Sequence, residues 1–164
     1  MENKIKIFEA FVFELLKWYK KEKGDYRNND LSKLKTLKLL FLWVSRDKEL
    51  LKIFNNFQAW TYGPVEKDIY DAIVGKGEGL TFFEVTNSKT IKKPLKVQID
   101  ADNQKIAEKI VSELKDRNKK LINKNALTLV NITHMWESWK LTYEFGWNME
   151  ESLILSDKWF FGES

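Results

Sequence analysis

The segment between Ser32 and Ser45 constrains the fold more than any other part of the sequence. It reads SKLKTLKLLFLWVS, and the six residues from 39 to 44 are all apolar. Leu34 and Leu37 lead into this run at helical spacing, and Ser32 has the side chain of a helix N-cap. A helix that is apolar on most of its sides must be surrounded by other elements. The sequence therefore predicts a globular chain built around one central helix.

Amphipathic segments are expected to surround this central helix. Residues 4–23, and residues from Asp102 to about 117, carry apolar side chains at helical spacing with charged residues between them. This pattern predicts helices with one buried face and one solvated face, and Asp102 is a suitable N-cap for the second. Further helices are expected near residues 48–54, from Pro64 to about 74, over 126–143, and over 149–160 with Asn148 as cap.

Two short segments have the composition of β-strands. Residues 80–85 are rich in β-branched and aromatic side chains, residues 93–99 (KPLKVQI) are the second expected strand, and a polar loop joins them. They are therefore expected to pair as an antiparallel hairpin. The sequence thus predicts an α+β fold that is mainly α, with about six helices and a small antiparallel hairpin or sheet near residues 80–99. With 164 residues, of which 43% are hydrophobic, the chain is expected to form a single domain over residues 1–164.

The composition excludes several classes of site. The chain has no cysteine, so it has no thiolate nucleophile, disulfide or zinc finger, and it needs no oxidising compartment. The N-terminal residues lack the uninterrupted apolar core of a signal peptide. No stretch reaches the roughly 18 uncharged apolar residues that a membrane-spanning helix needs. We therefore expect a cytoplasmic protein that has no membrane partner.

The chain contains a single histidine, His134. Two-histidine metal sites are therefore impossible, and a histidine-based catalytic triad would depend on this one residue. Thr133 is adjacent in sequence, but neighbours on a helix point in different directions. We interpret His134 as a structural, hydrogen-bonded residue and expect no cofactor, no metal and no enzymatic activity. A small hydrolase that uses His134 and a carboxylate stays open as an alternative.

Seven tryptophans give the chain a high aromatic content, and four of them lie in its final third. Tryptophan is enriched both in cores and at the energetic centres of interfaces. Core packing is expected for most of the seven, with one or two on a partner surface. The candidates for that surface are Trp136, Trp139 and Trp159.

The charge of the chain permits binding to nucleic acid but does not favour it. The formal net charge is +4, yet only three of the 28 basic residues are arginine. Base and phosphate recognition relies strongly on the bidentate guanidinium group of arginine. A nucleic-acid-binding accessory protein of a prophage or other mobile element is therefore the second interpretation, behind protein binding.

Two separated blocks form a recognisable pattern. The first is LSKLKTLKLLFLWVS followed by NFQAWTYGPVEKDIYDAI, and the second is LVNITHMWESWK. Together with the ending SLILSDKWFF, they resemble the Panacea domain of the SocA-like antitoxin family over roughly residues 31–161. The family motif falls here on Trp60, Tyr62, Gly63, Pro64, Val65, Tyr70, Thr133 and His134.

This resemblance implies a function as well as a fold. Members of the family are mainly helical with a small sheet, and they usually neutralise a neighbouring toxin by direct binding. The resemblance therefore implies that the partner is a cognate protein toxin encoded by an adjacent gene. A role as an adaptor that delivers the partner to a protease is a further possibility within the family. The motif residues are expected to form a scaffold or to contact the partner.

Overall fold

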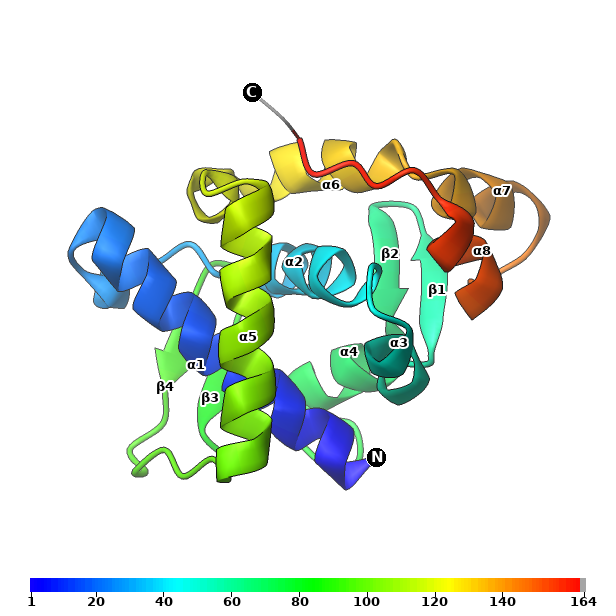
Figure 1. Cartoon of the computed structure of the whole chain (residues 1–164). Coiled ribbons are helices and arrows are strands. Elements are labelled where there is room, and N and C mark those ends of the chain that lie inside the picture. The colour runs from blue at the N-terminus through cyan, green and yellow to red at the C-terminus, as the bar shows by residue number, and fades with distance from the viewer. Residues whose placement is uncertain (163–164) are drawn as a thin grey trace.

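The computed structural model describes residues 1–162, and Figure 1 shows how their helices and strands are arranged. Helices dominate and two short antiparallel hairpins complete the fold, which confirms the prediction of an α+β fold that is mainly α. Two one-turn 3-10 helices are η1 (Tyr26–Asn28) and η2 (Leu121–Asn123). The strands are β1 (Phe57–Trp60), β2 (Gly63–Glu66), β3 (Phe83–Val85) and β4 (Thr90–Lys92). The α-helices are α1 (Glu2–Lys23), α2 (Lys33–Val44), α3 (Lys48–Ile53), α4 (Lys67–Ile73), α5 (Ala101–Arg117), α6 (Ala126–His134), α7 (Glu137–Phe145) and α8 (Glu151–Ser156).

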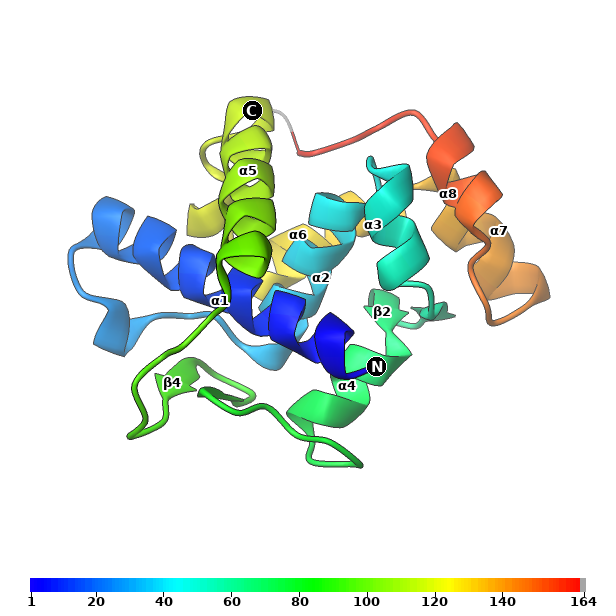
Figure 2. The same cartoon turned by 60° about the horizontal axis from the view of Figure 1, so that its bottom comes forward.

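Helix α2 is packed between α5, α6 and strand β2, as Figures 1 and 2 show. Every side chain from residue 39 to residue 44 is fully buried. The Trp43 ring stacks on Phe11 of α1, with 4.6 Å between the ring centroids. Ser32 Oγ accepts a hydrogen bond from the backbone N–H of Lys35 at 3.2 Å, so Ser32 is the N-cap of this helix. The prediction of a surrounded central helix is confirmed.

Helices α1 and α5 cross each other and pack together through their apolar faces (Figure 1). The N-cap of α5 is Asp100, so the prediction that Asp102 caps this helix is wrong. Asp100 Oδ1 accepts a hydrogen bond from the backbone N–H of Asn103 at 2.9 Å, whereas Asp102 lies inside the first turn. An acidic residue in that turn still stabilises the helix, because it faces the positive end of the helix dipole.

The segment around Gly63 and Pro64 does not begin a helix, and this expectation is wrong. It forms strand β2, which pairs with β1 in an antiparallel hairpin, and α4 begins only after this strand. Pro64 has no backbone N–H to donate. It is tolerated there because its strand partner Ala59 needs no hydrogen bond from that position. The Ala59 N–H points to the opposite edge and donates to the Trp147 carbonyl at 2.9 Å.

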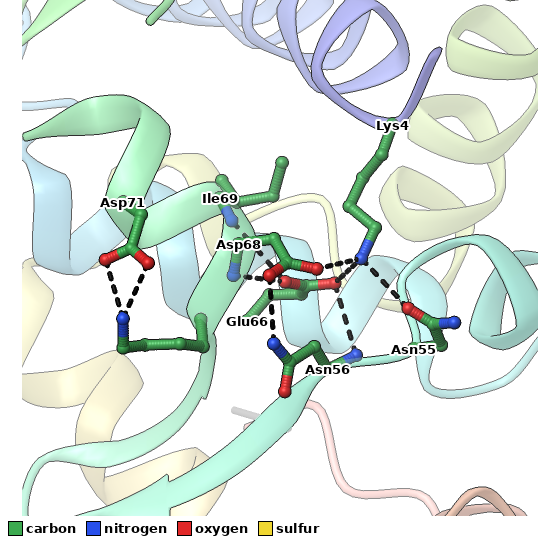
Figure 3. A network of polar contacts seen from close by, with 8 residues as sticks. Lys4, Asn55, Asn56, Glu66, Asp68, Ile69 and Asp71 are labelled. Carbon is green, nitrogen blue, oxygen red and sulfur yellow. Dashed lines mark hydrogen bonds and ion pairs between the residues drawn. The ribbon is translucent and has the colours of Figure 1, made fainter. Parts of the chain in front are cut away.

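A buried polar cluster fixes the N-terminal end of α1 against the start of α4 (Figure 3). Lys4 Nζ lies 2.8 Å from Glu66 Oε2 and 2.7 Å from Asp68 Oδ2, and it donates to Asn55 Oδ1 at 3.0 Å. Glu66 also caps α4, since its Oε1 accepts from the Asp68 backbone N–H at 2.8 Å. Lys4 and Glu66 are both buried, so each charge depends on the other for its stability.

The second hairpin is displaced from its expected position. Strand β3 lies within the expected first strand, but β4 precedes residues 93–99 instead of covering them. Asn29 fixes Thr90 of β4, because it accepts from the Thr90 N–H at 3.0 Å and donates to the Thr90 carbonyl at 2.9 Å. Glu9 of α1 accepts three hydrogen bonds from the backbone N–H groups of residues 81–83. Contacts with distant residues therefore decide where this hairpin forms.

The C-terminal helices are shorter than expected. Residues 126–143 divide into α6 and α7, which is one reason why residues 1–162 hold eight α-helices and not about six. The final helix, α8, covers only part of the expected range of 149–160, and Glu150 precedes it in place of Asn148. Asn148 instead forms an isolated β-bridge with Gln58 of β1. The chain therefore lies along the outer edge of β1 before α8 begins.

Candidate binding site

The two blocks of the family motif meet at the turn between β1 and β2. Gly63 has a φ angle of 105°, and a Cβ atom built on it would lie 2.6 Å from Thr133 Oγ1 in α6. Thr133 is fully buried, and its Oγ1 donates to the Val130 carbonyl at 2.9 Å. Only glycine combines this backbone conformation with such a close approach. Gly63 and Thr133 therefore position the hairpin against α6.

A buried lysine lies beneath this contact. Lys38 of α2 is 0% exposed, and its Nζ donates to the Pro64 carbonyl at 2.6 Å. No carboxylate pairs with it among residues 1–162, and burial lowers the pKa of Lys38 to about 7. Sequence reasoning missed this residue, because lysine on a helix is ordinarily assigned to the solvated face.

Three aromatic rings form a stacked column beside the turn. The ring centroids of His134 and Trp139 are 3.9 Å apart, and those of Trp139 and Tyr143 are 5.0 Å apart. Trp139 Nε1 donates to the Trp60 carbonyl at 2.9 Å, and the Tyr143 hydroxyl lies 3.3 Å from Thr61 Oγ1. The column therefore holds the end of β1 and the turn that follows it.

His134 contacts the β1–β2 turn through a hydrogen bond to its backbone. His134 Nε2 lies 3.2 Å from the Thr61 carbonyl, which can only accept, so Nε2 carries the proton. Burial lowers the pKa of His134, the Thr61 hydrogen bond acts in the opposite direction, and the charge of Lys38 lowers it further. Within the described residues, no carboxylate or hydroxyl group hydrogen-bonds to the imidazole. The hydrogen-bond partner of the imidazole within the described residues is therefore a backbone carbonyl.

A groove of about 700 Å³ opens between α2, the β1–β2 hairpin, α4 and the segment that follows α7. Trp60, Val65 and Tyr70 of the motif line it, and the Trp60 and Tyr70 rings meet edge to face at 4.9 Å. Lys33 is the only lining residue with a charged side chain, and its Nζ lies 5.1 Å from the centre of the Tyr70 ring. The groove is therefore apolar and aromatic, with one cation.

Aromatic side chains are exposed to solvent around this groove. Tyr62 of the motif is 61% exposed in the turn, Phe145 is 80% exposed at the end of α7, and Trp147 is 78% exposed where it lines the groove. Tyr143 of the stacked column is also exposed and lines the groove. We call these four residues the aromatic surface; three of them line the groove, and Phe145 directly precedes the lining residue Gly146. Exposed apolar side chains that gather in one place are typical of interaction sites.

The predicted surface tryptophans lie in three different environments. Trp136 is 1% exposed and packs in the core, so the expectation that it contributes to a partner surface is wrong. Trp139 is half-buried within the stacked column. Trp159 is 40% exposed, and its ring centre lies 5.2 Å from the guanidinium carbon of Arg46 and 4.9 Å from that of Arg117. Trp159 and the half-buried Trp139 remain surface candidates, and both lie outside the groove lining.

Sequence reasoning also missed three of the four residues of the aromatic surface, Tyr143, Phe145 and Trp147. The available signal was the segment YEFGW, in which aromatic residues flank a glycine that ends a helix. Aromatic residues next to the glycine that ends a helix are harder to bury than those on the packed face of the helix, because the connecting segment runs over the protein surface.

Within residues 1–162, no group of three or more His, Asp or Glu side chains is placed to hold a metal ion. No helix in this part of the chain is long and apolar enough to cross a membrane. Comparisons with protein-family models, with curated proteins and with solved structures gave no match. The resemblance to the Panacea domain therefore stays a prediction that depends on the motif residues.

Proposed function

We propose that this protein is a cytoplasmic antitoxin that neutralises a cognate protein toxin by direct, non-catalytic binding. The observation that carries the proposal is the aromatic surface, where Tyr62, Phe145 and Trp147 are largely exposed around an apolar groove. Aromatic side chains are the most frequent energetic anchors of protein interfaces. The first motif block lines this groove, and the second contacts it at the β1–β2 turn through Thr133 and His134. The antitoxin role itself is what the family resemblance implies.

The anchors we assign are Phe145 and Trp147. The Trp147 carbonyl accepts a hydrogen bond from the Ala59 N–H at 2.9 Å, so an ordered backbone presents its exposed indole ring. Anchors that are ordered before binding lose less conformational entropy when the complex forms. An interface of ordinary size, about 1,600 Å² in total, would cover the groove and the aromatic surface together.

The chemistry of the groove also suggests which part of the toxin it receives. Lys33 provides the one charged group among the lining residues, and the remaining walls are mostly apolar. A toxin segment with an apolar or aromatic side chain and a nearby carboxylate would complement both features. An adaptor that presents its partner to a protease would use the same surface, and the outcome for the toxin distinguishes the two roles.

The proposal is tested by expressing the product of the adjacent gene in cells with and without this protein. We expect the neighbour alone to stop growth, and co-expression to restore growth and yield a complex that survives affinity purification. A constant toxin level in rescued cells indicates occlusion, and its disappearance indicates delivery to a protease. A harmless neighbour that forms no complex would contradict the pairing with that gene.

A further inference from the structure

The basic side chains of this protein are distributed unevenly. Residues 17–27 and 115–124 together carry ten lysines and arginines but only three acidic residues. The whole chain has 28 basic and 24 acidic residues, so the remainder of the chain is more acidic than basic. The net charge of +4 therefore originates from these two segments.

The two basic segments lie side by side in the fold. The first contains the C-terminal end of α1 and η1, and the second contains the C-terminal end of α5 and η2. Helix α1 packs against both α5 and η2, and Figures 1 and 2 place these ends on the same side of the molecule. The Lys115 Nζ lies 5.4 Å from the centre of the Trp18 ring, which joins the two segments directly. We call the basic side chains of residues 17–27 and 115–124 the basic face.

A buried lysine lies between the two basic segments. Lys35 Nζ donates to the Ile122 carbonyl of η2 at 2.7 Å. Burial lowers the pKa of Lys35, and the positive charge of Lys23 acts in the same direction. Lys23 at the end of α1 is therefore electrostatically coupled to a group that contacts η2.

Most cations of the basic face are free of carboxylate partners. Among the described residues, only Lys17 and Arg27 of the ten form an ion pair, with Glu14 and Asp25 respectively. Eight of the ten side chains are exposed, and the other two, Lys115 and Lys124, are partly exposed. Unpaired charges of one sign that share a surface create a positive potential that attracts polyanions.

We infer that the basic face binds the phosphate backbone of nucleic acid, independently of sequence. Eight of its ten cations are lysines, which contact phosphates as mobile point charges and are poorly suited to reading base edges. The cations are spread over α1, η1, α5 and the residues that flank η2. A nucleic acid offers a regular array of negative charges to such a face, and counterion release stabilises the contact. The C-terminal ends of α1 and α5 lie away from α7, on the other side of the molecule (Figures 1 and 2). Both surfaces can therefore be occupied together, and this inference does not depend on the proposed function.

The inference is tested by fluorescence anisotropy with labelled duplex DNA and duplex RNA of about 20 base pairs, at salt concentrations from about 50 to about 200 mM. We expect the wild-type protein to bind at the lowest salt concentration and to lose affinity steeply as salt increases. The test variant is K21E/K119E/K120E, which changes three exposed lysines of the basic face. It should bind at least about tenfold more weakly, with a salt slope about three units less steep.

A matched control separates the basic face from net charge. K48E/K105E/K109E changes the net charge equally, but its three exposed lysines lie on α3 and in the first half of α5. It should stay within about threefold of the wild type. The inference would be overturned if both variants lost affinity for nucleic acid equally, or if the wild type bound poly-glutamate as tightly as nucleic acid. Absence of binding at low salt would overturn it as well. Tighter binding to the DNA or to the RNA identifies the source of the phosphates. If the test variant does not melt like the wild type, K21Q/K119Q/K120Q replaces it, with K48Q/K105Q/K109Q as control.

Discussion

Gly63 and Thr133 lie in segments far apart in the sequence, yet a Cβ atom at position 63 would lie only 2.6 Å from Thr133 Oγ1. Gly63 also has a φ angle of 105°, which side chains with a Cβ rarely adopt. This contact joins the two motif blocks and fixes the turn that presents Tyr62. The position of Tyr62 in the aromatic surface therefore depends on Gly63, which itself contributes no side chain to that surface.

Gly63→Ala is expected to lower the free energy of unfolding by about 2–3 kcal/mol, through backbone strain and the clash with Thr133. Gly24→Ala is the matched control, since its φ angle is 86° and nothing lies within 4 Å of the added Cβ. The loss in the free energy of unfolding that Gly24→Ala causes, about 1 kcal/mol, therefore measures the backbone strain alone. Urea denaturation gives the free energy of unfolding of both variants. A loss at position 63 no larger than that at position 24 would contradict the close contact.

Lys38 makes the stability of the protein depend on pH. Its pKa is about 7 in the folded protein and near the ordinary value of 10.5 in the unfolded chain, so between these values the unfolded chain binds more protons. The contribution of Lys38 to the free energy of unfolding therefore rises as pH increases through this range, by up to about 1.4 kcal/mol per pH unit. Lys38→Met removes this contribution. Denaturation of both proteins between pH 7 and pH 10 should give a smaller slope for the variant, and equal slopes would refute the buried, uncompensated lysine.

The Lys4 cluster should contribute more to stability than any exposed ion pair. Lys4→Met leaves Glu66 buried without its cation, and we expect a loss of about 3 kcal/mol in the free energy of unfolding. Lys6→Met is the control, because Lys6 pairs with Glu2 at the surface and should cost about 0.5 kcal/mol or less. The double variant K4M/E66Q should lose less than the sum of its two single changes, and strict additivity would argue against the pair.

His134 is expected to titrate below its ordinary pKa of 6.5, chiefly because it is partly buried. Its contribution to stability is therefore present above pH 6.5 and is lost as pH falls through the folded pKa. Because His134 is the only histidine, NMR can follow its imidazole resonances without ambiguity. Lys38→Met should raise the pKa of His134, since the charge of Lys38 helps to lower it. A midpoint at or above 6.5 in the wild type would be inconsistent with this environment.

Much of the helical framework could be predicted from the sequence, because periodicity and capping are local signals. The apolar run after Ser32 specified the central helix, and the spacing of apolar residues specified the buried faces of α1 and α5. The turn at Gly63 and Pro64 was misassigned, since proline suits both the first turn of a helix and a strand position that needs no N–H. The contact that decides between them is the Ala59 hydrogen bond to Trp147, which lies far away in sequence.

The candidate site was predictable only in part. The motif residues do converge around one turn, but the sequence analysis expects Trp136 at a partner surface together with Trp139. The chain instead breaks between α6 and α7, so Trp136 enters the core while Trp139 joins the stacked column. The buried position of Lys38 was also hidden, because its environment is created by the hairpin and α6 together.

The affinity of the aromatic surface for the co-purified toxin tests the central claim most directly. Calorimetry should show that Trp147→Ala and Phe145→Ala each weaken binding by about 2 kcal/mol or more, about thirtyfold in Kd, with unchanged melting temperatures. Leu127→Ala is the control, since Leu127 is 63% exposed on α6 and neither it nor its chain neighbours line the groove. This variant should bind within about twofold of the wild type. Full affinity in both aromatic variants, with their fold intact, would contradict the assignment of this surface as the toxin-binding site.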